Sequence, residues 1–157
     1  MRSLTVLYDA RCGLCSTARR WLEGQRQVVP LEMLPADSPE TRRRFPTLAA
    51  AEPEELVVVG DDGSVYRGSH AWIMCLWALD EYREWSFRLA TPALLPRARG
   101  IVAWISTRRH RLSRALGMMS DYEIAAAAGV AGSCVDGRCE KTGPMPILPI
   151  PSPGRSR

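Results

Sequence analysis

Two cysteines separated by two residues, Cys12 and Cys15, lie near the start of the chain, between an apolar run and an amphipathic segment. The apolar run, Leu4 to Tyr8, is typical of a short buried strand, and the segment after it has helical spacing. Two thiols at this spacing meet within one helical turn, and the N-terminus of a helix stabilises a thiolate. The pattern indicates thiol–disulfide exchange; the alternatives are a metal site and two unreactive buried thiols.

The position of each cysteine indicates its role in such an exchange. We expect Cys12 to cap the helix, remain accessible and act as the attacking thiolate, and Cys15 to point inward as the resolving thiol. Arg11 directly precedes the first cysteine and adds to the acidity of that thiol if its side chain faces the sulfur. Asp9 either accepts a proton from Cys15 or satisfies backbone N–H groups of the turn.

The elements expected around the pair have the order β-α-β-α-β-β-α. They are predicted at residues 3–8, 12–25, 28–34, 35–51 (a loop and a short helix), 56–59, 65–66 and 69–82. Pro30 cannot donate a hydrogen bond to a neighbouring strand, so it places the second strand at a sheet edge. A β-α-β unit followed by a hairpin and a packing helix predicts a four-stranded mixed α/β sheet of the thioredoxin-like class.

Three regions are expected along the chain. Residues 1–88 would form the thioredoxin-like core, 89–128 a C-terminal helical extension, and 129–157 a flexible tail rich in Gly and Pro. In the extension, one long helix or two short ones would end at Gly117, and a further short helix is expected at 121–128.

Composition excludes several classes of protein. The chain has 157 residues, a net charge of +4 and five cysteines, an odd number that argues against a complete disulfide framework. Basic residues do not alternate with stacking aromatics, so nucleic acid is not expected as a partner. We find neither a signal peptide nor an apolar run of about 18 residues that would span a membrane. These features predict a cytoplasmic protein and leave its oligomeric state open.

The stretch from Val6 to Cys15 resembles the signature of the DCC family of thiol–disulfide oxidoreductases, in which a strand ends in Tyr-Asp-Gly-Asp/Glu-Cys-x-x-Cys. Residues 66–71 are similar to the family's Gly-x-x-Ala at a helix start. The later helical region, with Pro96 and a basic stretch at 108–111, is also similar. Together the resemblance spans about residues 4–117.

The resemblance implies a thioredoxin-like fold, protein-disulfide reductase-type activity, and functional roles for Asp9, Cys12 and Cys15. Two departures from the family pattern stand out: Ala10 replaces a glycine, and Arg11 replaces an acid. We expect the arginine to make Cys12 more acidic and the redox couple more oxidising.

Further candidates lie elsewhere in the chain. Pro53 is the nearest candidate for the cis-proline that thioredoxin-like folds set opposite the nucleophile. Gly68, Ser69 and His70 are expected beside the cysteine pair, with Ser69 as a helix N-cap. His70 would act as an acid or base or contact the substrate, or it is simply an exposed histidine in the first turn of a helix.

The remaining cysteines have several interpretations. Cys75 lies on an apolar helical stripe and is expected to be a small buried hydrophobe. Cys134 and Cys139 are incidental thiols, a second redox pair that exchanges with the first, or half of a four-cysteine zinc site. We expect no metal and no bound organic cofactor.

The leading hypothesis is an enzyme that cycles Cys12 and Cys15 between dithiol and disulfide. Its partners would be a disulfide-containing protein or a small thiol substrate, together with a thiol electron donor. The rivals are a redox-inactive thioredoxin-like binding module and a zinc-stabilised structural protein. The sequence does not decide between reduction and oxidation.

Overall fold

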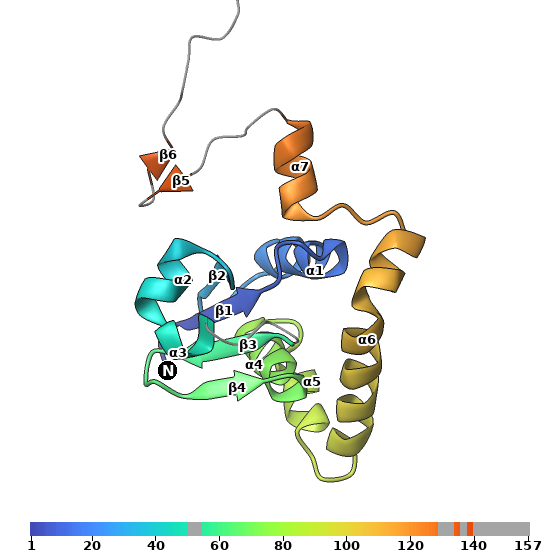
Figure 1. Ribbon diagram of the computed structural model, residues 1–157. Coiled ribbons are helices and arrows are strands. Elements are labelled where there is room, and N and C mark those ends of the chain that lie inside the picture. Colours follow the sequence, from blue (N-terminus) through green and yellow to red (C-terminus); the bar gives the residue numbers. More distant parts are fainter. Residues whose placement is uncertain (50–54, 129–133, 136–137, 140–157) are drawn as a thin grey trace, which may run out of the picture.

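The computed structural model describes residues 1–49, 55–128, 134–135 and 138–139 (Figure 1). The elements are β1 (Leu4–Tyr8), α1 (Gly13–Glu23), β2 (Leu31–Pro35), α2 (Pro39–Arg44), α3 (Pro46–Ala49), β3 (Val57–Gly60), β4 (Val65–Arg67), α4 (Ser69–Ala78), α5 (Arg83–Leu89), α6 (Leu95–Ala115), α7 (Asp121–Ala127), β5 (Cys134–Val135) and β6 (Arg138–Cys139).

A four-stranded mixed sheet in the order β2-β1-β3-β4 forms the centre of the molecule. Strand β1 is parallel to β2 and antiparallel to β3, and β3 forms a hairpin with β4. The topology confirms the predicted thioredoxin-like α/β fold. Strand β2 lies at a sheet edge, as Pro30 indicated, and Pro30 itself immediately precedes the strand.

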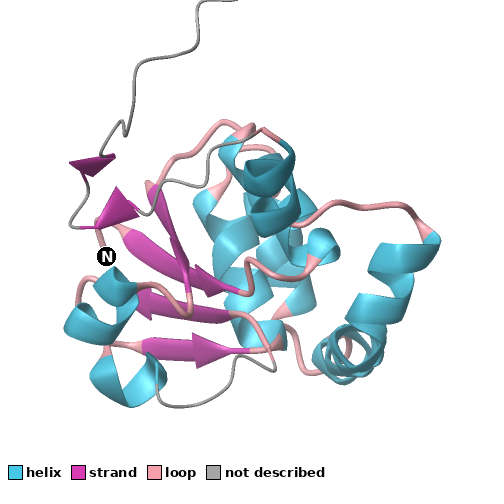
Figure 2. Cartoon of the chain, turned by 45° about the horizontal axis from the view of Figure 1, so that its top comes forward, coloured by secondary structure: helices cyan, strands magenta, loops and turns pink. Residues whose placement is uncertain are grey.

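Each face of the sheet carries its own layer of helices (Figure 2). On one face Leu4 and Val6 of β1 join the fully buried residues Leu22 of α1 and Ala71 and Cys75 of α4. On the other face a smaller cluster packs around Leu7, Val57 and Val59, together with Phe45 and Leu48 from the region of α2 and α3. The alternation along β1 follows from the period-two geometry of a strand. It fixes the end of β1, and hence the start of α1, within the core.

The C-terminal helices lie beside the sheet. Helix α6 is one continuous helix of 21 residues with Pro96 in its first turn, where a missing N–H costs nothing. It packs against α1 and α4 and is followed by Gly117, whose φ is +61°. Ser120 then caps α7 through a capping box with Glu123. The predicted short helix after Gly117 is therefore confirmed, and the long-helix alternative is the one observed.

Several local predictions were wrong. The helix predicted at 69–82 ends at Ala78, and a separate helix, α5, follows it. The second strand begins at Leu31 rather than at residue 28, because the N–H groups of Val28 and Val29 donate instead to the carbonyl of Ala78. Helix α4 is capped by Gly68, with φ +54°, rather than by Ser69, which is its first helical residue. A glycine suits this backbone conformation because it has no Cβ.

Other predictions concern residues that lie wholly or mostly outside the described ranges. Pro53 lies outside the described residues, and no cis peptide bond occurs within them. The predicted tail, 129–157, is also outside them except for the two short strands β5 and β6. The division at residues 88 and 128 stays a prediction.

Candidate dithiol site

Cys12 and Cys15 form the first turn of α1, directly after β1. Cys12 is the N-cap of the helix, and its sulfur accepts a hydrogen bond from the backbone N–H of Cys15, with an N to Sγ distance of 3.4 Å. The Cys15 thiol donates a second hydrogen bond to the same sulfur. Both cysteines are free thiols. The Cys12 sulfur is therefore placed to carry negative charge, with two donors and a helix N-terminus directed at it.

The two thiols have opposite pKa shifts. The hydrogen bond from Cys15 is the largest cause that lowers the pKa of Cys12, to about 6, and it outweighs the effect of burial. His110 lowers this pKa further, whereas the charge of Asp9 raises it. The same thiol–thiol hydrogen bond, together with burial, raises the pKa of Cys15 far above its usual range. Near neutral pH the pair thus holds one thiolate, on Cys12, and one proton, on Cys15.

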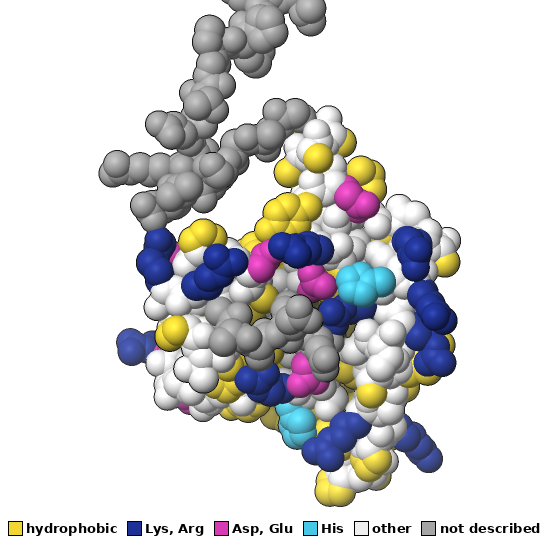
Figure 3. Space-filling model, in the orientation of Figure 1, with side chains coloured by type: hydrophobic (Ala, Val, Ile, Leu, Met, Phe, Trp, Pro, Cys, Tyr) yellow, Lys and Arg dark blue, Asp and Glu magenta, His cyan; other side chains and the backbone are white. Residues whose placement is uncertain are grey.

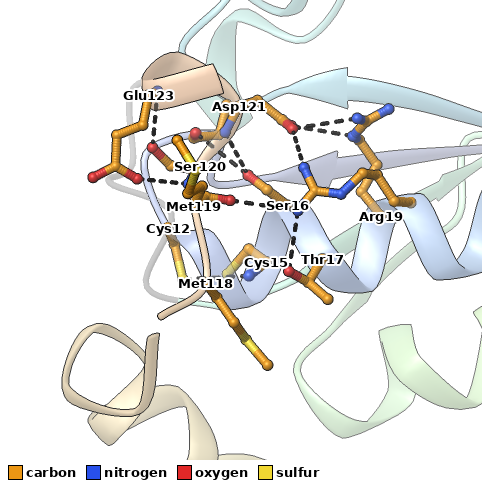
Figure 4. Close-up of polar contacts among 12 residues, drawn as sticks. Cys12, Cys15, Ser16, Thr17, Arg19, Met118, Met119, Ser120, Asp121 and Glu123 are labelled. Carbon is orange, nitrogen blue, oxygen red and sulfur yellow. Dashed lines mark hydrogen bonds and ion pairs between the residues drawn. The ribbon is translucent and has the colours of Figure 1, made fainter. Parts of the chain in front are cut away.

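The expectation that Cys12 remains accessible was wrong, because its exposed fraction is 0% while Cys15 is half-buried. The connection between α6 and α7 passes directly over the first turn of α1 (Figure 4). A Cβ on Gly13 would collide with the carbonyl of Met118, and the N–H of Leu14 donates to Ser113 Oγ at 2.9 Å. We call residues Gly117–Ser120 the cover segment. Only a glycine at position 13 permits this approach.

Polar contacts anchor the far end of the cover segment to α1 (Figure 4). The Asp121 carboxylate accepts from Arg19 Nε at 3.1 Å and from Arg20 Nη1 at 3.0 Å. The Asp121 N–H donates to Ser16 Oγ at 3.0 Å, and Arg20 also donates to the carbonyl of Met119. The start of α7 is therefore held to α1 one turn beyond the cysteines.

Asp9 lies between the cysteine turn and α6. Its Oδ1 accepts from the N–H of Arg11 at 2.9 Å, and its carbonyl accepts from the N–H of Cys12. Its Oδ2 is 3.4 Å from Arg109 Nη2 and 3.9 Å from His110 Nε2. The carboxylate thus shapes the turn and also holds a cation from α6 beside the thiols. Arg109 and His110 were missed as site residues; their only sequence signal was the basic stretch at 108–111.

Arg11 has a different partner from the one expected. Its Nη2 lies 3.2 Å from the Asp37 carboxylate, and its guanidinium stacks over the ring of Tyr122, which donates to the same carboxylate. The side chain is largely exposed. The guanidinium of Arg11 thus faces Asp37 rather than Cys12, and it is His110 of α6 that lowers the pKa of Cys12.

Two cavities adjoin the site. One of about 300 Å³ is mostly apolar; Cys15, Leu14 and Trp72 line it, with Asp9 and Arg109 at its polar end. The other, about 1110 Å³, lies between the start of α4 and α6. Its lining includes Gly68, Ser69, His70, Arg99, Arg109 and His110. The predicted residues 68–70 therefore share a cleft with Arg109 and His110, which face Asp9, although neither cysteine lines that cleft.

Of the remaining cysteines, only Cys75 has a described side chain, and it lies apart from this site. Cys75 is fully buried in the core, and burial raises its pKa to about 12. The backbones of Cys134 and Cys139 pair across β5 and β6, but their side chains lie outside the described part, so their redox role stays a prediction.

Within the described ranges, no three His, Cys, Asp or Glu side chains gather into a metal-binding group. None of the helices described there combines the length and hydropathy needed to span a membrane.

A thioredoxin-like sheet with a Cys-x-x-Cys pair at the start of its first helix defines a protein of the thiol–disulfide exchange class. The sequence model of the DCC1-like thiol-disulfide oxidoreductase family matches residues 6–115, and the chain belongs to this family. The match runs from β1 to the end of α6, so it includes Asp9, both cysteines, Arg109 and His110. Neither curated proteins nor solved structures gave a match.

Proposed function

We propose that the protein is a protein-disulfide reductase-type enzyme in which Cys12 is the nucleophile and Cys15 the resolving thiol. One observation carries the proposal: the Cys12 sulfur accepts hydrogen bonds from both the thiol and the backbone N–H of Cys15 at the N-terminus of α1. The resulting pKa of about 6 makes Cys12 largely a thiolate at neutral pH. Its five cysteines, an odd number, fit a reducing compartment such as the cytoplasm.

The exchange proceeds in two steps. The Cys12 thiolate attacks one sulfur of the substrate disulfide, which breaks the substrate S–S bond, forms a mixed disulfide and releases one substrate thiolate. Cys15 then gives its proton to solvent or to the released substrate thiolate and attacks the Cys12 sulfur, which closes the Cys12–Cys15 disulfide and releases the second substrate thiolate. The substrate gains two electrons. A dithiol, or two monothiols, returns them to the enzyme, and no bound organic cofactor is required.

The negative charge of Asp9 affects both exchange steps through the pKa values of the two thiols. While Cys12 is a thiolate, a bare carboxylate next to it would raise the pKa of both thiols. Arg109 offsets that charge through its ion pair with Asp9. We propose Asp9 as a positioning residue that holds the turn and retains Arg109 and His110 at the site.

The experiment that tests the function is trapping of the mixed disulfide. Dithiothreitol-driven reduction of a model protein disulfide is measured for the wild type, Cys12→Ser and Cys15→Ser. We expect the wild type alone to turn over and Cys15→Ser alone to accumulate a covalent adduct with the substrate. Cys75→Ser serves as a control that leaves turnover unchanged, because Cys75 lies in the core. A wild-type protein without reductase activity would reject the enzyme in favour of a binding module.

A further inference from the structure

The larger cavity beside the site is rich in cationic groups. Arg67, Arg99 and Arg109 line it, and Glu55 is its one lining carboxylate among the described residues. Basic and histidine side chains, dark blue and cyan in Figure 3, lie around this face between the sheet and α6. With its histidines neutral, the lining therefore carries an excess of positive charge.

Two of these arginines have no carboxylate partner among the residues that the structure describes. In the described part of the chain, Arg67 and Arg99 form no ion pair with a carboxylate, unlike Arg11, Arg19 or Arg44. Arg99 instead donates to His70 Nε2 at 2.9 Å. Because a guanidinium only donates, this nitrogen of His70 is the acceptor and carries no proton. As far as the described residues go, the cleft thus contains two guanidinium groups without a carboxylate partner, one of them bonded to His70.

The backbone of α4 adds to the positive charge of the cleft. Helix α4, with 10 residues, begins in the wall of the cleft at Gly68, Ser69 and His70, and it has no side-chain cap. Its N-terminal N–H groups therefore add partial positive charge on the same side as the arginines. The carboxylate of Glu55 lies against Gly68, at this same helix N-terminus.

The cleft adjoins the dithiol site through two residues of α6. Arg109 and His110 line it and at the same time lie 3.4 Å and 3.9 Å from the Asp9 carboxylate, three residues before Cys12. Cations at one end of an extended cleft raise the local concentration of an anionic partner. The volume of about 1110 Å³ is large for a small ligand and suits a peptide segment.

We propose that this cleft selects protein disulfides whose flanking sequence is acidic, with Arg67 and Arg99 as specificity-determining residues. The inference rests on the proposed function and names its substrate class. Carboxylates of the substrate would lie between α4 and α6, while its disulfide reaches Cys12 once the cover segment moves aside.

The test compares two peptides, each with one intrachain disulfide, that differ only in Glu or Gln residues beside the cysteines. For the wild type we expect kcat/KM to favour the acidic peptide about tenfold at low ionic strength and much less at high salt. The double variant Arg67→Gln/Arg99→Gln should lose most of this preference and keep its rate with the neutral peptide. Arg88→Gln is the matched control, since Arg88 is exposed on α5, pairs with Glu84 and does not line the cleft.

The outcomes separate this inference from the proposed function. Equal rates for the two peptides in the wild type, or a preference that survives the double variant, would overturn the cleft as a specificity site. Oxidised glutathione is included as a small anionic disulfide. If it alone depends on the two arginines, the peptide proposal is wrong and a small substrate takes its place. Failure of Cys12 to exchange with any of these disulfides would overturn the function itself and the inference with it.

Discussion

The Asp9 carboxylate, at the end of β1, lies 3.4 Å from the guanidinium of Arg109 in the middle of α6. This pair brings the C-terminal helical region to the cysteine turn. Both side chains are mostly buried, with exposed fractions of 14% and 16%. The electrostatics of the dithiol site therefore depend on α6 as much as on α1.

The pH dependence of thiol reactivity follows from the lowered pKa of Cys12. Alkylation of Cys12 by iodoacetamide, followed by peptide mass spectrometry, should be slow below pH 6 and reach its plateau above it, with a midpoint of about 6. Cys15→Ala should raise the midpoint, because it removes the thiol donor that is the largest cause of the low pKa. A wild-type midpoint near the ordinary cysteine value would contradict this picture.

The lowered pKa of Cys12 should also make the folding stability depend on pH. The folded pKa of Cys12 is depressed, so the thiolate contributes stability that is fully present above the unfolded pKa of 9.0 and is lost as pH falls to about 6. The free energy of unfolding of the reduced protein should therefore rise between these values more in the wild type than in Cys12→Ser. Parallel urea denaturation series across this range measure the difference; equal slopes for the two proteins would be the opposing result.

The histidine on α6 should matter more to the pKa of Cys12 than the neighbouring arginine. His110→Gln should raise the alkylation midpoint of Cys12, since a side chain that lowers the pKa of this thiol is lost. Arg11→Gln is the matched control, because its guanidinium pairs with Asp37 instead. A larger shift for the arginine variant would restore the tuning role predicted from the sequence.

Because the cover segment lies so close to Gly13, a methyl group at this position should change both the stability of the protein and the accessibility of Cys12. Gly13→Ala should destabilise the protein by about 1–3 kcal/mol, because the added Cβ collides with the Met118 carbonyl and Ser113 Oγ. It should also speed alkylation of Cys12, which is 0% exposed in the intact fold. Gly100→Ala is the control, because its Cβ would meet nothing within 4 Å. In the interior of a helix this change should increase the free energy of unfolding by up to about 1 kcal/mol. Thermal denaturation and alkylation rates check both, and unchanged Cys12 accessibility in Gly13→Ala would be evidence against the cover.

The ion pairs at Asp121 should hold the cover segment in place. Asp121→Asn should cost about 1–2 kcal/mol, between the values for exposed and buried pairs, and should increase the alkylation rate of Cys12 at fixed pH. The pKa of Cys12 should stay low, since its main causes are the hydrogen bonds from Cys15, burial, Asp9 and His110. Glu84→Gln, which breaks an exposed pair on α5, should change neither quantity. If both variants behave alike, Asp121 has no special part in covering the thiol.

Sequence alone determined the features that depend on local pattern. The spacing of Cys12 and Cys15 between a strand and a helix specified the dithiol turn, because helix geometry places residues three apart on one turn. The order of the elements predicted the thioredoxin-like sheet, and Pro30 predicted that its second strand lies at an edge. Resemblance to the family came from the same local residues.

Only the tertiary structure decided the surroundings of the thiols. That Cys12 is buried, that Asp9 meets Arg109 and His110, and that Arg11 faces Asp37 depend on where α6 and α7 pack. Such contacts join positions far apart in the chain, and no local periodicity encodes which side of a long amphipathic helix meets a given carboxylate. The reactivity of the cysteine pair was therefore readable from its spacing, whereas its access and its charge environment were set by the packing of the C-terminal helices.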